Sequence, residues 1–498
     1  MTIKNLSDIK PEDANSSTYG GKAANLSRMI KMGLPVPPGF VAPTSWTPHI
    51  GENKDPKLVK EFKTRLVSAI RGISSTENGQ WAATAGKPLV VSVRSGAPIS
   101  MPGMMDTILN VGLTAENLES FATAYNDRKF ALDCYRRLIQ MYGATVKDIP
   151  SSRFSPLFDN YRIFYYDGIT ESAYEDMISR YLDIYSTEAG ESFPDDPATQ
   201  LYEAGKAVYR SWYSDKAVQY REIEGIDHHL GTAVTVQKMV FGNLNDSATG
   251  VVFTHNPNTG EMGLYGDFLE GAQGEDVVSG AFKVKPISSM LKGDYKLLGR
   301  ELQAHLRDLY NAERDIIDVE FTVEQGKLWI LQYRKAKRST KASVRFIVDL
   351  VKRNEVTSND AAKRFFDLLP KKEISIEDHD QLEFVGKGIG VTSEIAVGKA
   401  ALSLEFVQQC IDKNEPYIFI ANETSPEDTP KMKDAAGILT AQGGTMSHAA
   451  VVARGWDKPC VVSANQLKID GTKFAMASTE YDEGALVKID GESGSIWM

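Results

Sequence analysis

The spacing of hydrophobic positions changes several times along this chain, and each change predicts a different kind of element. Between about residues 114 and 223, apolar residues recur at helical spacing, most clearly over 121–142 and 199–220. From Gly231 onward, alternation and short apolar runs between Asn and Gly turns predict an antiparallel sheet. Two more helical patterns, 344–354 and 360–369, stand in a charged stretch, and strands dominate after residue 384. The pattern predicts a multidomain α/β (α+β) chain.

The chain's most informative stretch lies near its carboxyl end. A short apolar strand, 437–440, leads into Gly443 and Gly444, and we expect Gly455 to stop a helix-compatible segment, 448–454. His448 therefore lies at a predicted helix start, where unpaired backbone N–H groups favour anions. An imidazole in this position suits a nucleophile that carries a phosphoryl group. By local sequence alone, an ordinary loop or cap histidine is the commoner interpretation.

Two cations also occupy positions that suit phosphate. Lys22 follows the glycine pair 20–21 at a predicted helix start, and Arg94 is expected at the end of a buried strand, 89–93, beside a Gly, Pro and Met-rich loop. An arginine there can grip phosphate oxygens in a fork. A solvated lysine and a structural salt bridge remain equally good interpretations of the two residues taken singly.

The segment 315–334 predicts a hairpin with segregated faces. Strands are expected over 318–323 and 327–334 around a three-residue turn, Glu324-Gln325-Gly326. Because side chains alternate, Val319, Phe321 and Val323 would share one face. The other face would carry the polar residues Asp318, Glu320, Gln332 and Arg334. Hard oxygen ligands beside an arginine suit Mg²⁺ bound to a polyphosphate, whereas a solvated edge hairpin is the alternative.

Three more carboxylates, Asp267, Glu275 and Asp276, fall near predicted strand or loop ends. Such residues can hold Mg²⁺ or a ribose hydroxyl near a phosphate site, although solvated loop carboxylates are commoner. No Walker A sequence is present, so a nucleotide site would be of another design.

Composition then narrows the class of protein. The 498 residues are too many for one ordinary core and suggest two to four domains. Hydrophobic residues make up 42%, and no apolar run approaches the roughly 20 residues that span a bilayer, so we expect a cytoplasmic protein without a membrane partner. A net charge of −10 argues against nucleic acid as a partner. Three scattered cysteines predict neither a disulfide framework nor a thiolate metal site.

Nine motifs, taken in order, resemble the pyruvate, phosphate dikinase family over essentially the whole chain: GGKAANL, VSVRSGA, SMPGMMDT, GTAVTVQ, MVFGN, AQGEDVV, VEFTVEQGKLWILQ, ETSPED and GGTMSHAAVVARG. The resemblance implies an ATP-grasp nucleotide-binding domain over 1–340, with its helical subdomain at about 114–223. A helical connector, 341–383, and a swivelling phosphohistidine domain, 384–498, would follow. In that family a histidine takes the β-phosphoryl group of ATP, orthophosphate receives the γ-phosphoryl group, and the phosphohistidine phosphorylates pyruvate at a separate barrel domain.

Carried over residue by residue, the resemblance implies that His448 is the nucleophile and that Lys22 and Arg94 bind phosphates. Glu320 and Gln332 would hold Mg²⁺, with Asp318 and Arg334 beside them. Asp267, Glu275 and Asp276 would line the nucleotide site.

The sequence also departs from the family pattern. Met446 replaces the threonine two residues before the histidine, and His255 stands where the family usually has arginine. No segment resembles the pyruvate/phosphoenolpyruvate barrel, so we expect half of a split dikinase whose barrel is another protein, a different acceptor, or a fragment. A non-catalytic ATP-binding regulatory partner is the alternative from another functional class.

Overall fold

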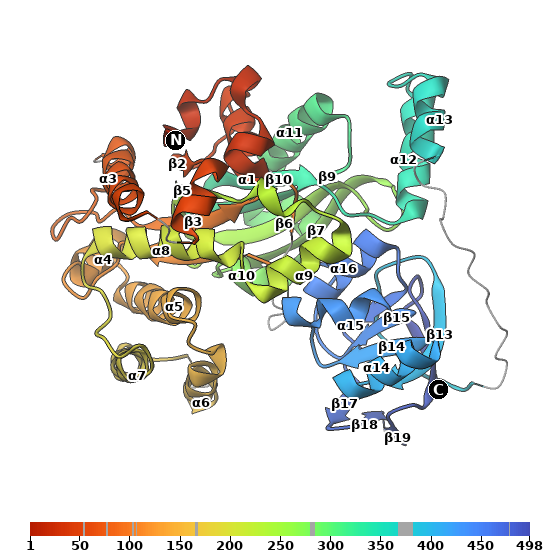
Figure 1. Ribbon diagram of the computed structural model, residues 1–498. Coiled ribbons are helices and arrows are strands. Elements are labelled where there is room, and N and C mark those ends of the chain that lie inside the picture. The colour runs from red at the N-terminus through yellow and green to blue at the C-terminus, as the bar shows by residue number, and fades with distance from the viewer. Residues whose placement is uncertain are drawn as a thin grey trace. The chain divides into compact units, whose positions relative to one another are not determined.

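The computed structural model describes residues 1–498 except 53–54, 76–77, 102–103, 106, 165–167, 279–283, 367–381 and 478. The described residues form two compact units (Figure 1). The first comprises Met1–Leu244 with Trp329–Gln332, and the second comprises Asn245–Leu328 with Tyr333–Met498. The predicted mixture of helices and sheets in a multidomain chain is confirmed.

The first unit contains a five-stranded antiparallel sheet in the order β1-β2-β5-β3-β4. Its strands are β1 (Lys4–Asn5), β2 (Gly39–Ala42), β3 (Val91–Gly96), β4 (Thr107–Val111) and β5 (Ala233–Lys238). Every residue of β2 and β5 is buried, because helices pack on this sheet and its apolar side chains join one large core. Arg94 lies inside β3 and not at a strand end, since the strand continues to Gly96.

The described part of this unit has nine α-helices: α1 (Ser16–Lys31), α2 (Thr47–Ile50), α3 (Pro56–Ile73), α4 (Leu118–Tyr125), α5 (Arg128–Val146), α6 (Ser155–Phe164), α7 (Glu171–Ala189), α8 (Pro197–Ser211) and α9 (Asp215–Glu224). The helical region predicted from periodicity is therefore confirmed, but its two long patterns are each divided. Asn126, with φ 51°, ends α4, and the Asp127 side chain caps α5 by accepting from the Phe130 N–H. Apolar spacing continues across this cap, which is why periodicity alone joined the helices.

Another sheet has the order β10-β9-β6-β7-β8, and except for Trp329–Gln332 of β10 its strands belong to the second unit. Its strands are β6 (Ala248–His255), β7 (Met262–Glu270), β8 (Lys285–Pro286), β9 (Ile317–Glu324) and β10 (Lys327–Lys335). Strands β7 and β9 each pair antiparallel with β6, so the predicted antiparallel pairing is confirmed. The prediction of one sheet from Gly231 onward is wrong, because β5, the first strand of that run, belongs to the other sheet. Helices α10 (Gly274–Val278) and α11 (Lys296–Glu313) belong to this part of the chain.

The hairpin turn between β9 and β10 is shorter than predicted. Glu324 is the last residue of β9, so the turn is Gln325-Gly326 and the expected three-residue turn is wrong. Both turn residues have positive φ, 47° and 77°, which is the geometry of a two-residue hairpin loop. The apolar face is as expected, since Val319, Phe321 and Val323 are fully buried.

After helices α12 (Thr340–Lys352) and α13 (Ser358–Phe366), the carboxyl-terminal part forms an eight-stranded sheet in the order β11-β21-β20-β13-β14-β15-β16-β12. The strands are β11 (Phe384–Lys387), β12 (Ile389–Gly390), β13 (Ile395–Ala401), β14 (Tyr417–Ala421), β15 (Gly437–Thr440), β16 (Cys460–Val462), β20 (Leu486–Asp490) and β21 (Ser495–Trp497). The predicted pattern 360–369 runs past Phe366 into residues outside the described ones.

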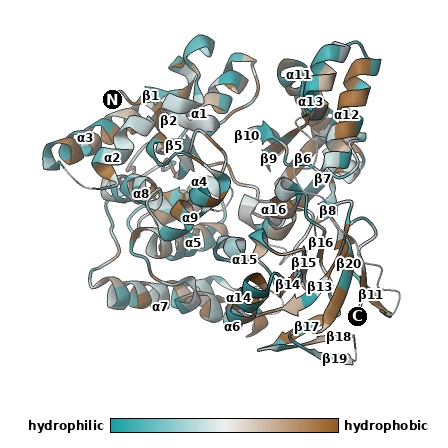
Figure 2. Ribbon diagram, turned by 45° about the vertical axis from the view of Figure 1, so that its right-hand side comes forward, coloured by the Kyte–Doolittle hydropathy of each residue, from teal (hydrophilic) through white to brown (hydrophobic). Residues whose placement is uncertain are grey.

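Strands β13 to β16 run parallel, and both faces of this central sheet are covered. Phe419 and Ile438 join a core with helices α14 (Leu404–Lys413), α15 (Thr429–Lys433) and α16 (His448–Trp456). Ile418 and Leu439 face the opposite core, where Phe474 belongs to a small sheet of β17 (Leu467–Asp470), β18 (Lys473–Met476) and β19 (Thr479–Asp482). Figure 2 shows hydrophobic stretches along β20 and α12.

The three cysteines, Cys134, Cys410 and Cys460, are buried and are not joined in disulfides. In the described part of the chain, none of the helices has the length and apolarity needed to cross a membrane.

Candidate active site

His448 begins α16, as the sequence predicted. Ser447 is the N-cap, and its hydroxyl accepts a hydrogen bond from the Ala450 N–H at 3.5 Å. The predicted stop at Gly455 is wrong, because the helix runs through Gly455 to Trp456 and Asp457, in the left-handed conformation, is the C-cap. Gly443, with φ 102°, adopts a conformation that favours glycine, and a Cβ there would lie 2.9 Å from the Ser447 Cβ. This close approach brings the glycine loop against the cap of the His448 helix.

The two ring nitrogens of His448 have different surroundings. Nδ1 lies 3.2 Å from the Thr424 hydroxyl, whereas Nε2 is enclosed and has no hydrogen-bond partner among the described residues. When Nδ1 carries the proton, its N–H donates a hydrogen bond to the Thr424 hydroxyl, and Nε2 holds a free lone pair. Burial lowers the pKa of His448 to about 4, so the ring is neutral at physiological pH. This arrangement leaves Nε2 as the atom that can attack an electrophile.

Lys22 is positioned by an unusual break in α1. Gly20 has φ 72° and ψ 157°, so the chain restarts a helix just before Lys22, as the predicted glycine turn required. A Cβ on Gly20 would lie 1.7 Å from the Gly96 carbonyl oxygen, and the Gly21 N–H donates to the Ala97 carbonyl at 2.9 Å. Only glycine permits this approach. The restarted helix therefore lies directly against the end of β3.

Arg94, the second predicted phosphate ligand, emerges from the same strand. Its Nη2 donates to the Oε1 of Gln332 at 3.2 Å, and both residues belong to the first unit. The structure thus brings together one predicted phosphate-binding residue and one predicted metal-binding residue. Gln332 is 9% exposed, and its amide oxygen is of the ligand type that Mg²⁺ prefers.

Asp318 and Arg334 form an ion pair on the β9–β10 hairpin. Both oxygens of Asp318 accept from the Arg334 Nε, at 2.9 and 2.8 Å. Burial raises the pKa of Asp318 to about 6, although the adjacent guanidinium acts in the opposite direction. In turn, the carboxylate holds the pKa of Arg334 above its ordinary value. Glu320 lies on the same strand as Asp318 and is half-buried, with its carboxylate oxygens chemically suited to Mg²⁺.

The three remaining carboxylates have different roles in the structure. Asp267 in β7 is half-buried, burial raises its pKa, and it accepts a hydrogen bond from Thr445 at 3.3 Å. Asp276 is buried and accepts from the Gln273 backbone N–H at 2.9 Å, so it stabilises the turn before α10. The side chain of Glu275 lies outside the described residues.

Both departures from the family pattern are buried. His255 packs against the rings of Tyr310 and Phe346, and burial lowers its pKa to about 4. It is therefore a neutral core histidine and not a cationic substitute for arginine. Met446 is 7% exposed and belongs to an apolar cluster that includes Val251.

Sequence reasoning missed the role of Thr424 and left the arginine pair 136–137 undecided. Thr424 belongs to the ETSPED segment, and its contact with His448 depends on how β14 and β15 pair in the sheet. The Arg136 guanidinium donates to Asp133 at 2.8 Å and stacks on Phe158, so this arginine is structural. Arg137 also pairs with Asp133, at 2.8 Å.

Comparison with known proteins shows which family the chain resembles. Residues 16–296 match the family described as pyruvate phosphate dikinase, AMP/ATP-binding domain, and residues 413–494 match the family described as PEP-utilising enzyme, mobile domain. The pyruvate, phosphate dikinase of Clostridium symbiosum is 37% identical over 98% of this chain and 57% of its own length. The enzyme of Rhizobium meliloti is 38% identical over 96% of this chain and 55% of its own. The chain spans about half the length of the curated relatives it matches.

Proposed function

Because the chain belongs to the pyruvate, phosphate dikinase family, we propose that it is a phosphotransferase that moves a phosphoryl group from ATP to His448. The observation that carries the proposal is the place of the His448 ring at the start of α16, where backbone N–H groups favour an anion. The ring is neutral, its Nδ1 faces Thr424, and its Nε2 has no hydrogen-bond partner among the described residues. The core histidine His255 shares this neutral state and a buried Nε2, but it lies in a strand among aromatic rings and not at a helix start.

The proposed reaction balances in two steps. The Nε2 lone pair attacks the β-phosphorus of ATP, a P–N bond forms, and AMP leaves with the electron pair of the broken P–O bond. The γ-phosphoryl group then passes to orthophosphate, which releases pyrophosphate and leaves phospho-His448. The unpaired N–H groups at the start of α16 would stabilise the phosphoryl charge.

Lys22 and Arg94 are the proposed ligands of the nucleotide phosphates, supported by the contact between α1 and the end of β3. We assign Mg²⁺ to Glu320 and Gln332, since Mg²⁺ keeps several waters and needs only one or two protein oxygens beside the phosphates. Its chemistry would be to neutralise charge on the phosphate oxygens. No cluster of three or more His, Cys, Asp or Glu in the described part of the chain offers a fuller protein cage.

Asp318 and Arg334 are proposed as neighbours of this metal site. Asp267, Glu275 and Asp276 are proposed to line the nucleotide. The hydrogen bond between Asp276 and the Gln273 backbone makes an indirect role, through the shape of the loop, the simpler assignment for that residue.

Pyruvate is the proposed onward acceptor because the relatives' names include it. The sequence-based prediction of a separate barrel protein is tested by adding a candidate barrel to phospho-His448 protein. Phosphoenolpyruvate formation should then rise with barrel concentration, since no tether supplies an effective concentration. Transfer to some other acceptor would leave phosphoenolpyruvate absent while phospho-His448 is still consumed.

The decisive experiment uses ATP labelled at the β position. Wild-type protein should gain an acid-labile, base-stable label, and His448→Ala should gain none while it still binds ATP. His229→Ala removes an exposed histidine and serves as the matched control. A label that persists in His448→Ala would refute the assignment. ATP binding without any label in the wild type would favour the regulatory partner instead.

A further inference from the structure

A charged cavity lies in the second unit, and its lining includes none of the residues assigned to catalysis. It encloses about 260 Å³ and is lined by Glu313, Arg314, Asp315, Lys335, Arg338, Ser343, Ile347 and Arg364. These residues come from the end of α11, the end of β10, the following loop, α12 and α13. Four cations face two carboxylates, and a third carboxylate, Glu355, pairs with Arg314 from outside the lining, so one positive charge is in excess.

The carboxylates of the cavity are already engaged. Asp315 pairs with Arg338 at 2.5 Å and with Lys335 at 3.5 Å, and it also accepts from the Ile316 N–H at 2.8 Å. Glu313 accepts from the Tyr333 hydroxyl at 2.6 Å. The charge of Arg314 is met by a carboxylate outside the lining, Glu355, at 2.8 Å.

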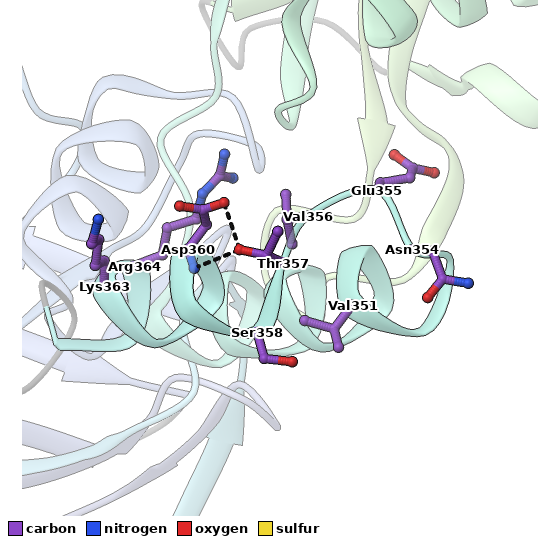
Figure 3. A pocket seen from close by; sticks show the side chains of 9 residues that line it. All are labelled: Val351, Asn354, Glu355, Val356, Thr357, Ser358, Asp360, Lys363 and Arg364. Carbon is purple, nitrogen blue, oxygen red and sulfur yellow. Dashed lines mark hydrogen bonds between the residues drawn. The ribbon is translucent and has the colours of Figure 1, made fainter.

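Arg364 is the cation without a counterpart. Asp360 is the acidic residue one turn before it on α13, but Asp360 accepts from the Thr357 hydroxyl at 2.7 Å (Figure 3). Among the described residues, no carboxylate pairs with the Arg364 guanidinium. This arginine also lines a neighbouring hollow between α12 and α13, with Lys363 on the same helix (Figure 3).

We propose that this cavity binds a small phosphate compound, either inorganic phosphate or a short phosphomonoester. The excess positive charge attracts an anion, and guanidinium groups present planar forks that match phosphate oxygens. The Ser343 hydroxyl accepts from the Arg338 Nε at 3.0 Å, so this fork is already held in place by the first turn of α12. The volume falls below the roughly 300–1,000 Å³ of drug-sized sites, which limits the ligand to a few carbon atoms.

Such a ligand would connect Arg364 of α13 to the loop after β10. It would therefore hold α13 against the rest of the second unit. This inference goes beyond the proposed phosphotransfer, because none of the cavity residues belongs to the assigned catalytic set.

The test titrates the full-length protein with glycerol 3-phosphate at constant ionic strength, with glycerol as the uncharged control. We expect one saturable site for the phosphomonoester and none for glycerol. Arg364→Gln should weaken binding about tenfold, as expected for the loss of a hydrogen bond to a charged group. Arg300→Gln, an exposed residue of α11 with the same charge change, should have no effect. Hydrogen exchange of the α13 amides should slow when the probe is bound.

Two further arms separate this site from the nucleotide site. The double variant Lys22→Ala/Arg94→Ala should still bind glycerol 3-phosphate. If free phosphate is the ligand, inorganic phosphate should compete with glycerol 3-phosphate for binding to this variant. Failure to compete would assign the site to phosphomonoesters. Three results would overturn the proposal. Binding could disappear in the double variant, survive Arg364→Gln unchanged, or fall equally in Arg300→Gln. Phosphorylation of His448 is measured separately, so failure of either proposal is recognised independently.

Discussion

Replacing Thr424 with valine tests whether the hydrogen bond to His448 selects the reactive nitrogen. Valine keeps the shape of threonine and removes the hydroxyl that lies 3.2 Å from Nδ1. Without this acceptor, the tautomer that carries its proton on Nε2 becomes more populated, and its Nε2 has no lone pair for attack. A net hydrogen bond contributes about 0.5–1.5 kcal/mol, which corresponds to roughly a 2- to 12-fold slower phosphorylation.

The assay is single-turnover formation of phospho-His448 at saturating ATP, Mg²⁺ and orthophosphate, with ATP binding measured in parallel. We expect Thr424→Val to lower the rate within that range and to leave the dissociation constant of ATP unchanged. Thr424→Ser should retain the wild-type rate, because it keeps the hydroxyl. Thr479→Val, at an exposed position of β19, controls for the substitution itself. An unchanged rate in Thr424→Val, despite an NMR spectrum that shows more Nε2–H tautomer, would refute the reasoning.

Four other predictions follow from the same geometry. Glu320→Ala and Gln332→Ala should raise the Mg²⁺ concentration needed for half-maximal phosphorylation and should slow the reaction more than they weaken ATP binding. Effects no larger than those of the control variant Glu324→Ala would favour a hairpin that is only solvated. Arg334→Met should lower the free energy of unfolding by about 3 kcal/mol, the low end for a broken buried pair because the Arg334 side chain is 35% exposed. Since the folded-state pKa of Asp318 is raised to about 6, the loss of stability in Arg334→Met should shrink as the pH falls below that value. Adding Asp318→Asn to Arg334→Met should restore the stability measured by urea titration. The His448 ring should titrate near pH 4 by NMR, and a midpoint near its ordinary value would contradict its burial. Finally, no regulatory phosphate should map to Thr445, because Met446 occupies the family's usual threonine position and has no hydroxyl.

Local pattern was sufficient where neighbouring residues decide the structure. The strand before the glycine loop, the helix that begins at His448 and the glycine break before Lys22 all follow from short-range rules of capping and backbone freedom. The order of the motifs was also enough to identify the family, which the comparisons confirm. These features require no knowledge of which strands are neighbours.

Short-range rules failed where two conformations had similar local signals. The hairpin turn contains two residues and not three, because Gln325 adopts a positive φ that its residue type does not announce. Similarly, α4 and α5 are separate helices although their apolar spacing runs on across Asn126. In both cases the packing of the finished sheet or core selects among locally acceptable alternatives.

The environments of the chemical groups were decided only by the tertiary structure. The sequence by itself determined that His448, Arg94, Asp318 and Gln332 are present and on which elements they lie. The depressed pKa of His448, the Thr424 contact and the pairing of Arg94 with Gln332 arise from segments far apart in the chain. Burial and pairing are properties of the folded surroundings, and a change of partner can reverse the direction of a pKa shift without any change in local sequence.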